Sequence, residues 1–388
     1  GALGREGVTR RKYFQLLHRG VRFSHYVGVI QIGQLSIEVL PKADRDTRGN
    51  SDKWHTVLLD MLRECKLLKV ETQGRAHLRL RSNHLLELYF ELFLQELERL
   101  MRQGLLKSYR LHTGQLSVVK GRIDFQRQLT RALPDDTRFH TRYHRYEYDH
   151  LLNQVLQQAL LVLSRVVQQA QLRSHINALL RRFPKVSNLN VEEVHFRKII
   201  DQRKAKPYRR VLELARLILL NYSPDLKSGQ HDMLAILFDM NLLFEEYVFR
   251  ILQRSAPSGW RVSRQVQRPF WRRRSIRPDI LVEHQQRRMV LDTKWKVLSS
   301  TRPGIDELKQ MYVYCQYFRA RHAVLLYPQV FELEDLPPTP WQSVDAEAAV
   351  DSYCQLLFLE ILRDGKLHAG LAQDIWRKLQ KNEDYLLR

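Results

Sequence analysis

Hydrophobic and polar positions in the first part of the chain change from a strand period to a helix period. Residues 25–32 and 35–40, separated by Gly33 and Gln34, predict a β-hairpin that ends at Pro41. Apolar residues three and four positions apart predict helices over residues 54–62 and 83–103. A short β-like piece over 114–125 follows. Asp149 can cap the next helix, over 151–170, and the helical pattern continues to residue 220.

The pattern changes after the polar stretch 221–229, which is the best candidate for a linker. The later periodicity predicts a helix over 231–253, strands within 261–298, a helix over 304–320, a strand over 323–327, and helices over 346–363 and 371–380. This order is typical of a small α/β unit. We therefore predict an α+β or α/β protein with two domains, residues 1–230 and residues 231–388. The first would be a mixed, mostly helical region with an N-terminal β element.

Composition indicates a globular protein and excludes a disordered or fibrous one, because 44% of the 388 residues are hydrophobic. Cys65, Cys315 and Cys354 are far apart and form no C-x-x-C pair, which argues against a disulfide scaffold and a cysteine zinc site. No run approaches the roughly 18 apolar residues that a membrane span needs. We expect a reducing, cytoplasmic compartment and no membrane partner.

The charge balance points to a nucleic acid partner. Lys and Arg total 64 against 42 Asp and Glu, a net charge of +22. Phosphate attracts such a surface whatever the base sequence. The alternative is an arginine-rich surface that is only solvated.

The most informative chemistry lies in Arg277–Pro278–Asp279 and in Asp292–Thr293–Lys294. Two β-like runs flank a polar turn between these segments, so Asp279 and Asp292 can approach each other across a hairpin. Residues two apart on a strand share a face, so Asp292 and Lys294 point the same way. The alternative is a surface Asp–Lys pair on an edge strand.

Two carboxylates and an ammonium at one point suit a bound divalent cation, since Mg²⁺ favours carboxylates together with water and phosphate oxygens. Such a metal activates water and neutralises charge on a scissile phosphate, while Lys294 orients the water or stabilises the developing charge. Pro-Asp followed by Asp-x-Lys is the signature of the PD-(D/E)xK nuclease fold. The catalytic prediction is therefore Asp279, Asp292 and Lys294 with Mg²⁺, or possible Mn²⁺.

Neighbouring segments add candidates to this site. Glu245, in a predicted helix, is a third candidate metal ligand; the alternative is a solvated carboxylate. Gln310 and Tyr314 are four residues apart and therefore share a helix face. We expect them near the site and the DNA backbone. The alternative is that Tyr314 is only a core residue and Gln310 a surface residue. The segment 261–277 has seven arginines and no acid. Its nucleic-acid-binding candidates, together with Lys296, are Arg272, Arg273, Arg274 and Arg277.

Other catalytic schemes lack their motifs. The sequence contains no H-E-x-x-H, no G-x-S-x-G and no G-x-x-x-x-G-K-[ST]. We therefore expect that this chain does not hydrolyse a nucleoside triphosphate by itself.

Four segments give the chain a resemblance to a known family, the McrC family of nuclease subunits from McrBC-type modification-dependent restriction systems. They are residues 29–33 with 37–42, Lys120–Phe125 (Lys-Gly-Arg-Ile-Asp-Phe), Leu152–Leu156 around Asn153, and Leu291–Lys296 (Leu-Asp-Thr-Lys-Trp-Lys). The last is the most specific, because members typically have a hydrophobic residue, Asp-Thr-Lys and an aromatic residue there. The helix 240–248 also resembles many members, although not all keep the Glu at position 245.

The resemblance implies that Asp279, Asp292 and Lys294 form a nuclease triad. It further implies that the N-terminal part docks on a hexameric AAA+ GTPase of the McrB type, reaches into its pore and stimulates GTP hydrolysis. The polar loop 43–53 is a guess for the stimulating segment. Recognition of modified double-stranded DNA, often at methylated cytosine, would lie mainly on the partner. Double-strand cleavage would await translocation that brings two complexes together.

Two other functions remain open from the sequence. The chain could be a non-catalytic adaptor that activates a AAA+ partner and uses its basic groove only to hold nucleic acid. It could also be a stand-alone nuclease for RNA or branched DNA.

Overall fold

The computed structural model describes most of the chain in ten stretches. They are residues 14–18, 20–41, 43, 51–67, 85–130, 138–200, 202–223, 232–285, 287–342 and 352–385. No helix in these stretches is long and apolar enough to cross a membrane. Most of the polar loop 43–53, residues 44–50, lies outside the described residues.

The chain divides into two compact units that interleave along the sequence. Unit 1 comprises residues 1–28, 38–73 and 237–388, and unit 2 comprises residues 29–37 and 74–236. A single boundary at residue 230 is therefore not the division that the structure has. Residues 38–73 group with the C-terminal part because helix α2 (Ser51–Glu64) packs on helix α10 (Met240–Arg254).

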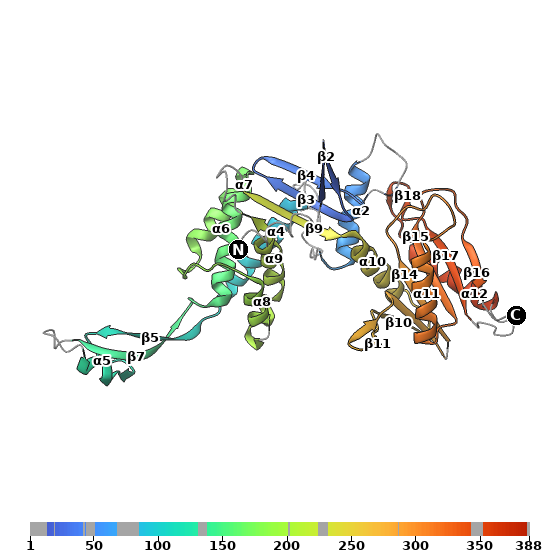
Figure 1. Cartoon of the computed structure of the whole chain (residues 1–388). Helices are drawn as coiled ribbons and strands as arrows, with labels where there is room; N and C mark the ends of the chain where they lie inside the picture. Colours follow the sequence, from blue (N-terminus) through green and yellow to red (C-terminus); the bar gives the residue numbers. More distant parts are fainter. Residues whose placement is uncertain are drawn as a thin grey trace. The chain divides into compact units, whose positions relative to one another are not determined.

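A six-stranded mixed sheet forms the centre of unit 1 (Figure 1). Its strands are β10 (Trp260–Arg264), β13 (Ile280–His284), β14 (Arg287–Thr293), β15 (His322–Pro328), β16 (Leu336–Pro340) and β17 (Tyr353–Leu359). The order is β10-β13-β14-β15-β17-β16. The first three strands are antiparallel neighbours, β14, β15 and β17 run parallel, and β16 is antiparallel to β17. Every residue of β15 is buried, as expected for an interior strand covered on both faces.

Two helices of unit 1 bring further site residues to this sheet. Helix α11 (Ile305–Phe318) packs on β14, β15 and β17, and α10 contacts β10 and β14. The carboxylate of Asp239 caps α10 by accepting hydrogen bonds from the amides of Asn241, at 3.0 Å, and Leu242, at 3.4 Å. The remaining elements of unit 1 are β11 (Arg268–Trp271), β12 (Arg274–Ile276), β18 (Leu362–Arg363), β19 (Lys366–Leu367) and α12 (Leu371–Tyr385).

The N-terminal β element predicted from the sequence is present. Strands β3 (Tyr26–Ile32) and β4 (Leu35–Val39) join β8 (Tyr222–Ser223) and β9 (Met233–Asp239) in the order β4-β3-β9-β8. Strands β1 (Phe14–Leu17) and β2 (Gly20–Phe23) form a separate antiparallel pair. Gly33 has a φ of 56°, which glycine adopts without strain in the turn between β3 and β4.

Unit 2 is built mainly from helices around a leucine-rich core. They are α4 (Leu85–Gln103), α6 (Leu151–Val166), α7 (Ala170–Arg182), α8 (Glu193–Ile200), the 3₁₀ helix η2 (Arg203–Tyr208) and α9 (Arg209–Leu220). Helix α6 packs on α7 and α9, and α4 packs on α9. The apolar stripes predicted for 83–103 and 151–170 supply this core.

A long β-ribbon extends away from the helices of unit 2 (Figure 1). Strand β5 (Ser108–Leu116) pairs with β7 (Phe139–Glu147) in an uninterrupted antiparallel register. The short strand β6 (Arg122–Ile123) and helix α5 (Phe125–Thr130) complete its far end. We call residues 108–130 and 138–147 the arm.

Several local predictions were wrong. The helix predicted over 231–253 begins only at Met240, and β9 precedes it. The helix predicted over 346–363 contains β17, because a short apolar run fits a buried strand as well as a helix. Asp149 does not cap α6, whose N-cap residue is His150. The carboxylate of Asp149 instead accepts hydrogen bonds from Ser187 and Gln154.

Candidate active site and exposed arm

The strand that carries Asp292 lies inside the sheet, not at its edge. β14 has β13 on one side and β15 on the other. Ile280 pairs with Leu291 at the end of β13, so the residue before it, Asp279, approaches Asp292 as the hairpin predicted. Asp292 is only 1% exposed. These observations exclude a surface Asp–Lys pair on an edge strand.

Asp279 is held by the residue between Asp292 and Lys294. One carboxylate oxygen of Asp279 accepts hydrogen bonds from the Thr293 amide, at 2.8 Å, and from the Thr293 hydroxyl, at 3.0 Å. Strand alternation alone would place Thr293 on the face opposite Asp292 and Lys294. The hydrogen bonds form because Asp279 lies just before β13 and can turn towards the end of β14.

Lys294 and Gln310 join the second carboxylate in one polar network. Lys294 Nζ lies 2.6 Å from Asp292 Oδ2. Gln310 donates to Asp292 Oδ1 and accepts from Lys294 Nζ, with both separations at 3.4 Å. The amide of Lys294 also donates to the carbonyl of Leu326, at 2.9 Å, so the strand pairing fixes the backbone here.

Helix α11 closes this network from one side. The side-chain amide of Gln310 donates to the Tyr314 hydroxyl at 2.7 Å, and that hydroxyl donates to the carbonyl of Arg277 at 2.9 Å. Tyr314 is only 6% exposed, so its ring is part of the core, as the alternative supposed. Gln310 is not a detached surface residue, because it contacts both Asp292 and Lys294.

Glu245 of α10 is buried beside the pair. It is 8% exposed and accepts a 2.6 Å hydrogen bond from Gln265, which excludes a merely solvated carboxylate. Burial and the nearby Asp279 carboxylate raise the pKa of Glu245. Within the described stretches no three acidic, His or Cys side chains form a group that could hold a metal by themselves.

The close packing of these charged groups shifts the pKa of each of them. Burial, and then the charge of Asp279, raise the pKa of Asp292 to about 7. Burial also raises the pKa of Asp279. Burial would lower the pKa of Lys294, but the Asp292 carboxylate outweighs it and the net pKa is raised. Two neighbouring carboxylates that repel each other, one buried and one half-buried, suit a divalent cation, with water or phosphate oxygens as its other ligands.

Comparison with known proteins places the chain in a family. The sequence model of the McrBC 5-methylcytosine restriction system component matches residues 21–328. The chain belongs to this McrBC family. A curated relative, the type IV methyl-directed restriction enzyme EcoKMcrBC of Escherichia coli (strain K12), is 20% identical over 246 residues, and the match covers 60% of this chain and 71% of the relative.

The fold of this McrBC-family chain also resembles a solved structure. A chain in a refined half-complex, from the tetradecameric assembly of Thermococcus gammatolerans McrB AAA+ hexamers with bound McrC, matches with a TM-score of 0.66 and 21% identity. The match covers 96% of this chain and 86% of the other. At this identity the likeness establishes the fold alone.

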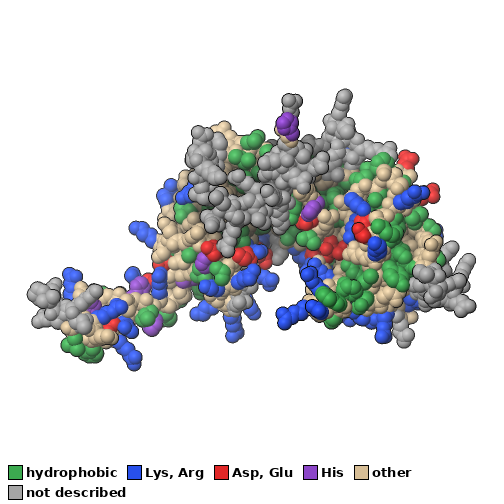
Figure 2. Space-filling view, in the orientation of Figure 1, with side chains coloured by type: hydrophobic (Ala, Val, Ile, Leu, Met, Phe, Trp, Pro, Cys, Tyr) green, Lys and Arg blue, Asp and Glu red, His purple; other side chains and the backbone are tan. Residues whose placement is uncertain are grey.

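The predicted nucleic-acid-binding residues of the McrBC-family chain differ in their surroundings. Arg272, Arg273, Arg274 and Arg277 are exposed, and Lys and Arg side chains gather where β11 and β12 lie in unit 1 (Figure 2). Lys296 differs, because its ammonium lies 2.8 Å from the carboxylate of Glu307.

Glu307 is a residue that the sequence analysis missed. Its carboxylate also accepts from the Gly304 amide at 3.0 Å and from the Tyr327 hydroxyl at 2.9 Å. Burial alone would raise the pKa of Glu307, but its hydrogen bonds lower it overall. Gly304 and Glu307 lie at the start of the same helix, but Lys296 and Tyr327 come from other parts of the sequence, so spacing did not predict that they join Glu307.

The tip of the arm explains why Lys120–Phe125 is a recognisable segment. Gly121 has a φ of 74°, and a Cβ there would lie 2.3 Å from the carbonyl oxygen of Arg142. The side chain of Asp124 accepts from Arg142 Nε at 2.9 Å. Glycine and aspartate therefore fold the tip back against β7. The arm leaves several apolar side chains in solvent, with exposed fractions of 72% for Val118, 67% for Phe125 and 78% for Leu129.

Asn153, from another of the resembling segments, fastens the base of the arm. It is fully buried in α6, and its amide donates to the carbonyls of Leu106, at 3.0 Å, and Tyr148, at 2.9 Å. These carbonyls lie at the two ends where the arm joins the helices. This buried side chain thus holds the ribbon where it joins the helices of unit 2.

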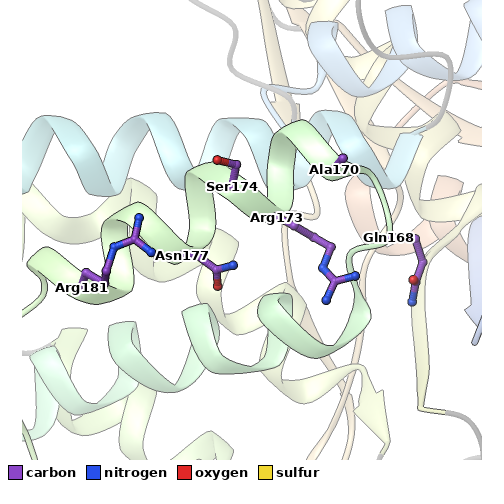
Figure 3. Close-up of a pocket in the computed structure, with 6 residues that line it drawn as sticks. All are labelled: Gln168, Ala170, Arg173, Ser174, Asn177 and Arg181. Atoms are coloured by element: carbon purple, nitrogen blue, oxygen red, sulfur yellow. The ribbon is translucent and has the colours of Figure 1, made fainter.

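A separate pocket of about 430 Å³ lies along α7 of unit 2 (Figure 3). Its lining consists of Gln168, Ala170, Arg173, Ser174, Asn177 and Arg181. None of these belongs to the predicted site, and the pocket is not the place where the two aspartates meet.

Proposed function

We propose that this chain is the DNA-cleaving subunit of a McrBC-type restriction system and hydrolyses phosphodiester bonds with a divalent metal. The observation that carries the proposal is the pair of the half-buried Asp279 and the buried Asp292, with Lys294 in contact with Asp292. The antiparallel hairpin β13–β14 followed by parallel β15 supports a PD-(D/E)xK nuclease domain.

Each residue of the site has a chemical role in this proposal. Asp279 and Asp292 would hold Mg²⁺ or Mn²⁺, and the bound ion supplies Lewis-acid stabilisation of charge on the scissile phosphate. The ammonium of Lys294 can donate a hydrogen bond to the attacking water or to the phosphate. Thr293 orients Asp279, and Gln310 steadies Lys294 against Asp292. Glu245 is the candidate for a third carboxylate close to the metal.

The proposed partner is a hexameric AAA+ GTPase of the McrB type. The solved structure with a similar fold is described as McrB AAA+ hexamers with bound McrC. The arm is the best candidate for docking, because its exposed apolar tip needs a covering surface. It would enter the pore of the hexamer and stimulate GTP hydrolysis, while the partner recognises modified double-stranded DNA.

The deciding experiment uses the full chain, methylated plasmid, Mg²⁺, and GTP or ATP, with and without the AAA+ protein of the same system. We expect cleavage only with partner and nucleotide. Asp292→Ala should lower the cleavage rate at least about a thousandfold, or ~4 kcal/mol, and leave stimulated nucleotide hydrolysis intact. Asp306→Ala is the matched control, because that carboxylate lies on α11 with its side chain 93% exposed.

Other outcomes select the other functions. Stimulated hydrolysis without cleavage under any condition would make the chain a non-catalytic adaptor. Cleavage by the purified chain without a partner would make it a stand-alone nuclease. Loss of both activities in a folded Asp292→Ala variant would contradict the separation of cleavage from motor stimulation.

A further inference from the structure

A small β-hairpin projects next to the two aspartates. Strands β11 and β12 form a two-stranded sheet of their own, joined by the turn Arg272–Arg273. Only Arg277 and Pro278 separate β12 from Asp279. Whatever the hairpin touches therefore lies close to the bond that the carboxylates act on.

The base of the hairpin is firmly attached to α11. Arg268 donates to the carbonyl of Tyr317 at 2.9 Å, and its guanidinium lies 5.2 Å from the centre of the Phe318 ring. The pairing skips Phe270, which forms a bulge, and its ring packs edge-on against Tyr317 at 5.1 Å. A bulge redirects side chains, and here it uses Phe270 as an anchor.

The tip has the opposite character. Trp271 is 61% exposed, although tryptophan is usually mostly buried, and the Arg272 guanidinium lies 4.7 Å from the centre of its ring. Arg272 has a φ of 49°, a conformation that favours glycine or asparagine. In the described part of the chain, Arg272, Arg273 and Arg274 form no ion pair. The turn thus accepts an unfavourable backbone conformation in order to present arginine beside an exposed indole.

We propose that this hairpin is a wedge that enters a DNA groove beside the scissile phosphate. A two-stranded ribbon fits the groove of duplex DNA, and tip arginines match its phosphates. Arginine alone would account for phosphate binding, but the exposed indole needs a flat apolar surface. An opened base step supplies that surface, and inserted apolar side chains unstack DNA in this way. Trp271 therefore stacks on a base at an opened step. The position of the scissile phosphate rests on the proposed function.

The test compares two short duplexes that differ only by one central mismatch. A mismatch lowers the cost of opening the step, so a wedge prefers it. Fluorescence anisotropy with the full chain should give about tenfold tighter binding to the mismatched duplex. Trp271→Ala should remove this preference, and Trp271→Phe should retain part of it. Arg273→Ala should weaken both duplexes alike and reduce the salt dependence by about one phosphate contact.

A matched control separates the wedge from exposed aromatic surface in general. Tyr312 is 40% exposed on α11, and Tyr312→Ala should keep the mismatch preference. Equal binding of both duplexes by the unchanged protein, or full preference in Trp271→Ala, would overturn the wedge. Equal binding of both duplexes is the result expected if the tip binds a protein partner instead of DNA. Cleavage without mismatch preference rejects the wedge alone, whereas mismatch preference without cleavage rejects the nuclease alone.

Discussion

The aspartate site of unit 1 and the arm of unit 2 treat polar and apolar groups in opposite ways. The site buries charge: Asp292 is 1% exposed, and burial with the nearby Asp279 raises its pKa to about 7. The arm exposes hydrophobic surface: Leu129 is 78% exposed. Neither arrangement stabilises an isolated folded chain, because buried charge and exposed apolar groups both cost free energy.

The difference indicates what each region lacks. The two neighbouring carboxylates with one lysine lack positive charge, which a small cation can provide within the site. Exposed valine, phenylalanine and leucine side chains lack a covering surface, which only a large partner can provide. The same chain thus carries one place suited to an ion and a phosphate, and one place suited to a protein.

Of the changes to the arm, the largest effect is expected from making its tip polar. Phe125→Ser with Leu129→Ser removes two exposed apolar side chains, so partner binding should weaken roughly a hundredfold with unchanged folding. Titration calorimetry with the AAA+ partner measures this. The matched control is Leu242→Ser, which changes a 56%-exposed leucine of α10 in unit 1. An unchanged affinity in the double variant would show that the arm is not the docking surface.

A smaller effect is expected from changing the backbone of the tip. Gly121→Ala places a Cβ 2.3 Å from the Arg142 carbonyl oxygen at a positive φ, so the tip must shift. We expect about a tenfold loss in stimulated nucleotide hydrolysis, because strain of this kind costs one to a few kcal/mol. Gly114→Ala is the control, since no atom lies within 4 Å of its Cβ. Equal stimulation by both variants would mean that tip shape is unimportant.

Sequence periodicity predicted those parts of the fold and site that depend on local spacing. The hairpin β13–β14 brought Asp279 towards Asp292, and spacings of two and four residues placed Lys294 with Asp292 and Gln310 with Tyr314. Each of these follows from strand or helix geometry alone.

What the sequence did not predict depends on contacts between separate elements. Gln265 donates a hydrogen bond to Glu245 from a different element. Lys296 and Tyr327, which are also far apart in the sequence, both donate hydrogen bonds to Glu307. The strands β9 and β17 were mistaken for helix because short apolar runs carry no decisive period. The predicted boundary at residue 230 also differs from the two units of the structure, because residues 38–73 join unit 1 through packing between distant elements.

The smallest effect concerns how the site holds its own charge. Thr293→Val keeps the strand and the hydrogen bond from the backbone amide to Asp279. It removes the 3.0 Å hydrogen bond from the side-chain hydroxyl. One hydrogen bond to a carboxylate is worth about 1 kcal/mol here, because the amide remains, so the Mg²⁺ concentration for half-maximal cleavage should rise about fivefold. A Mg²⁺ titration of plasmid cleavage measures it, and Thr293→Ser should behave like the unchanged protein. If valine and serine gave the same midpoint, the amide alone would suffice to orient Asp279. The buried site would then depend on its strand backbone, as the tip of the arm depends on Gly121.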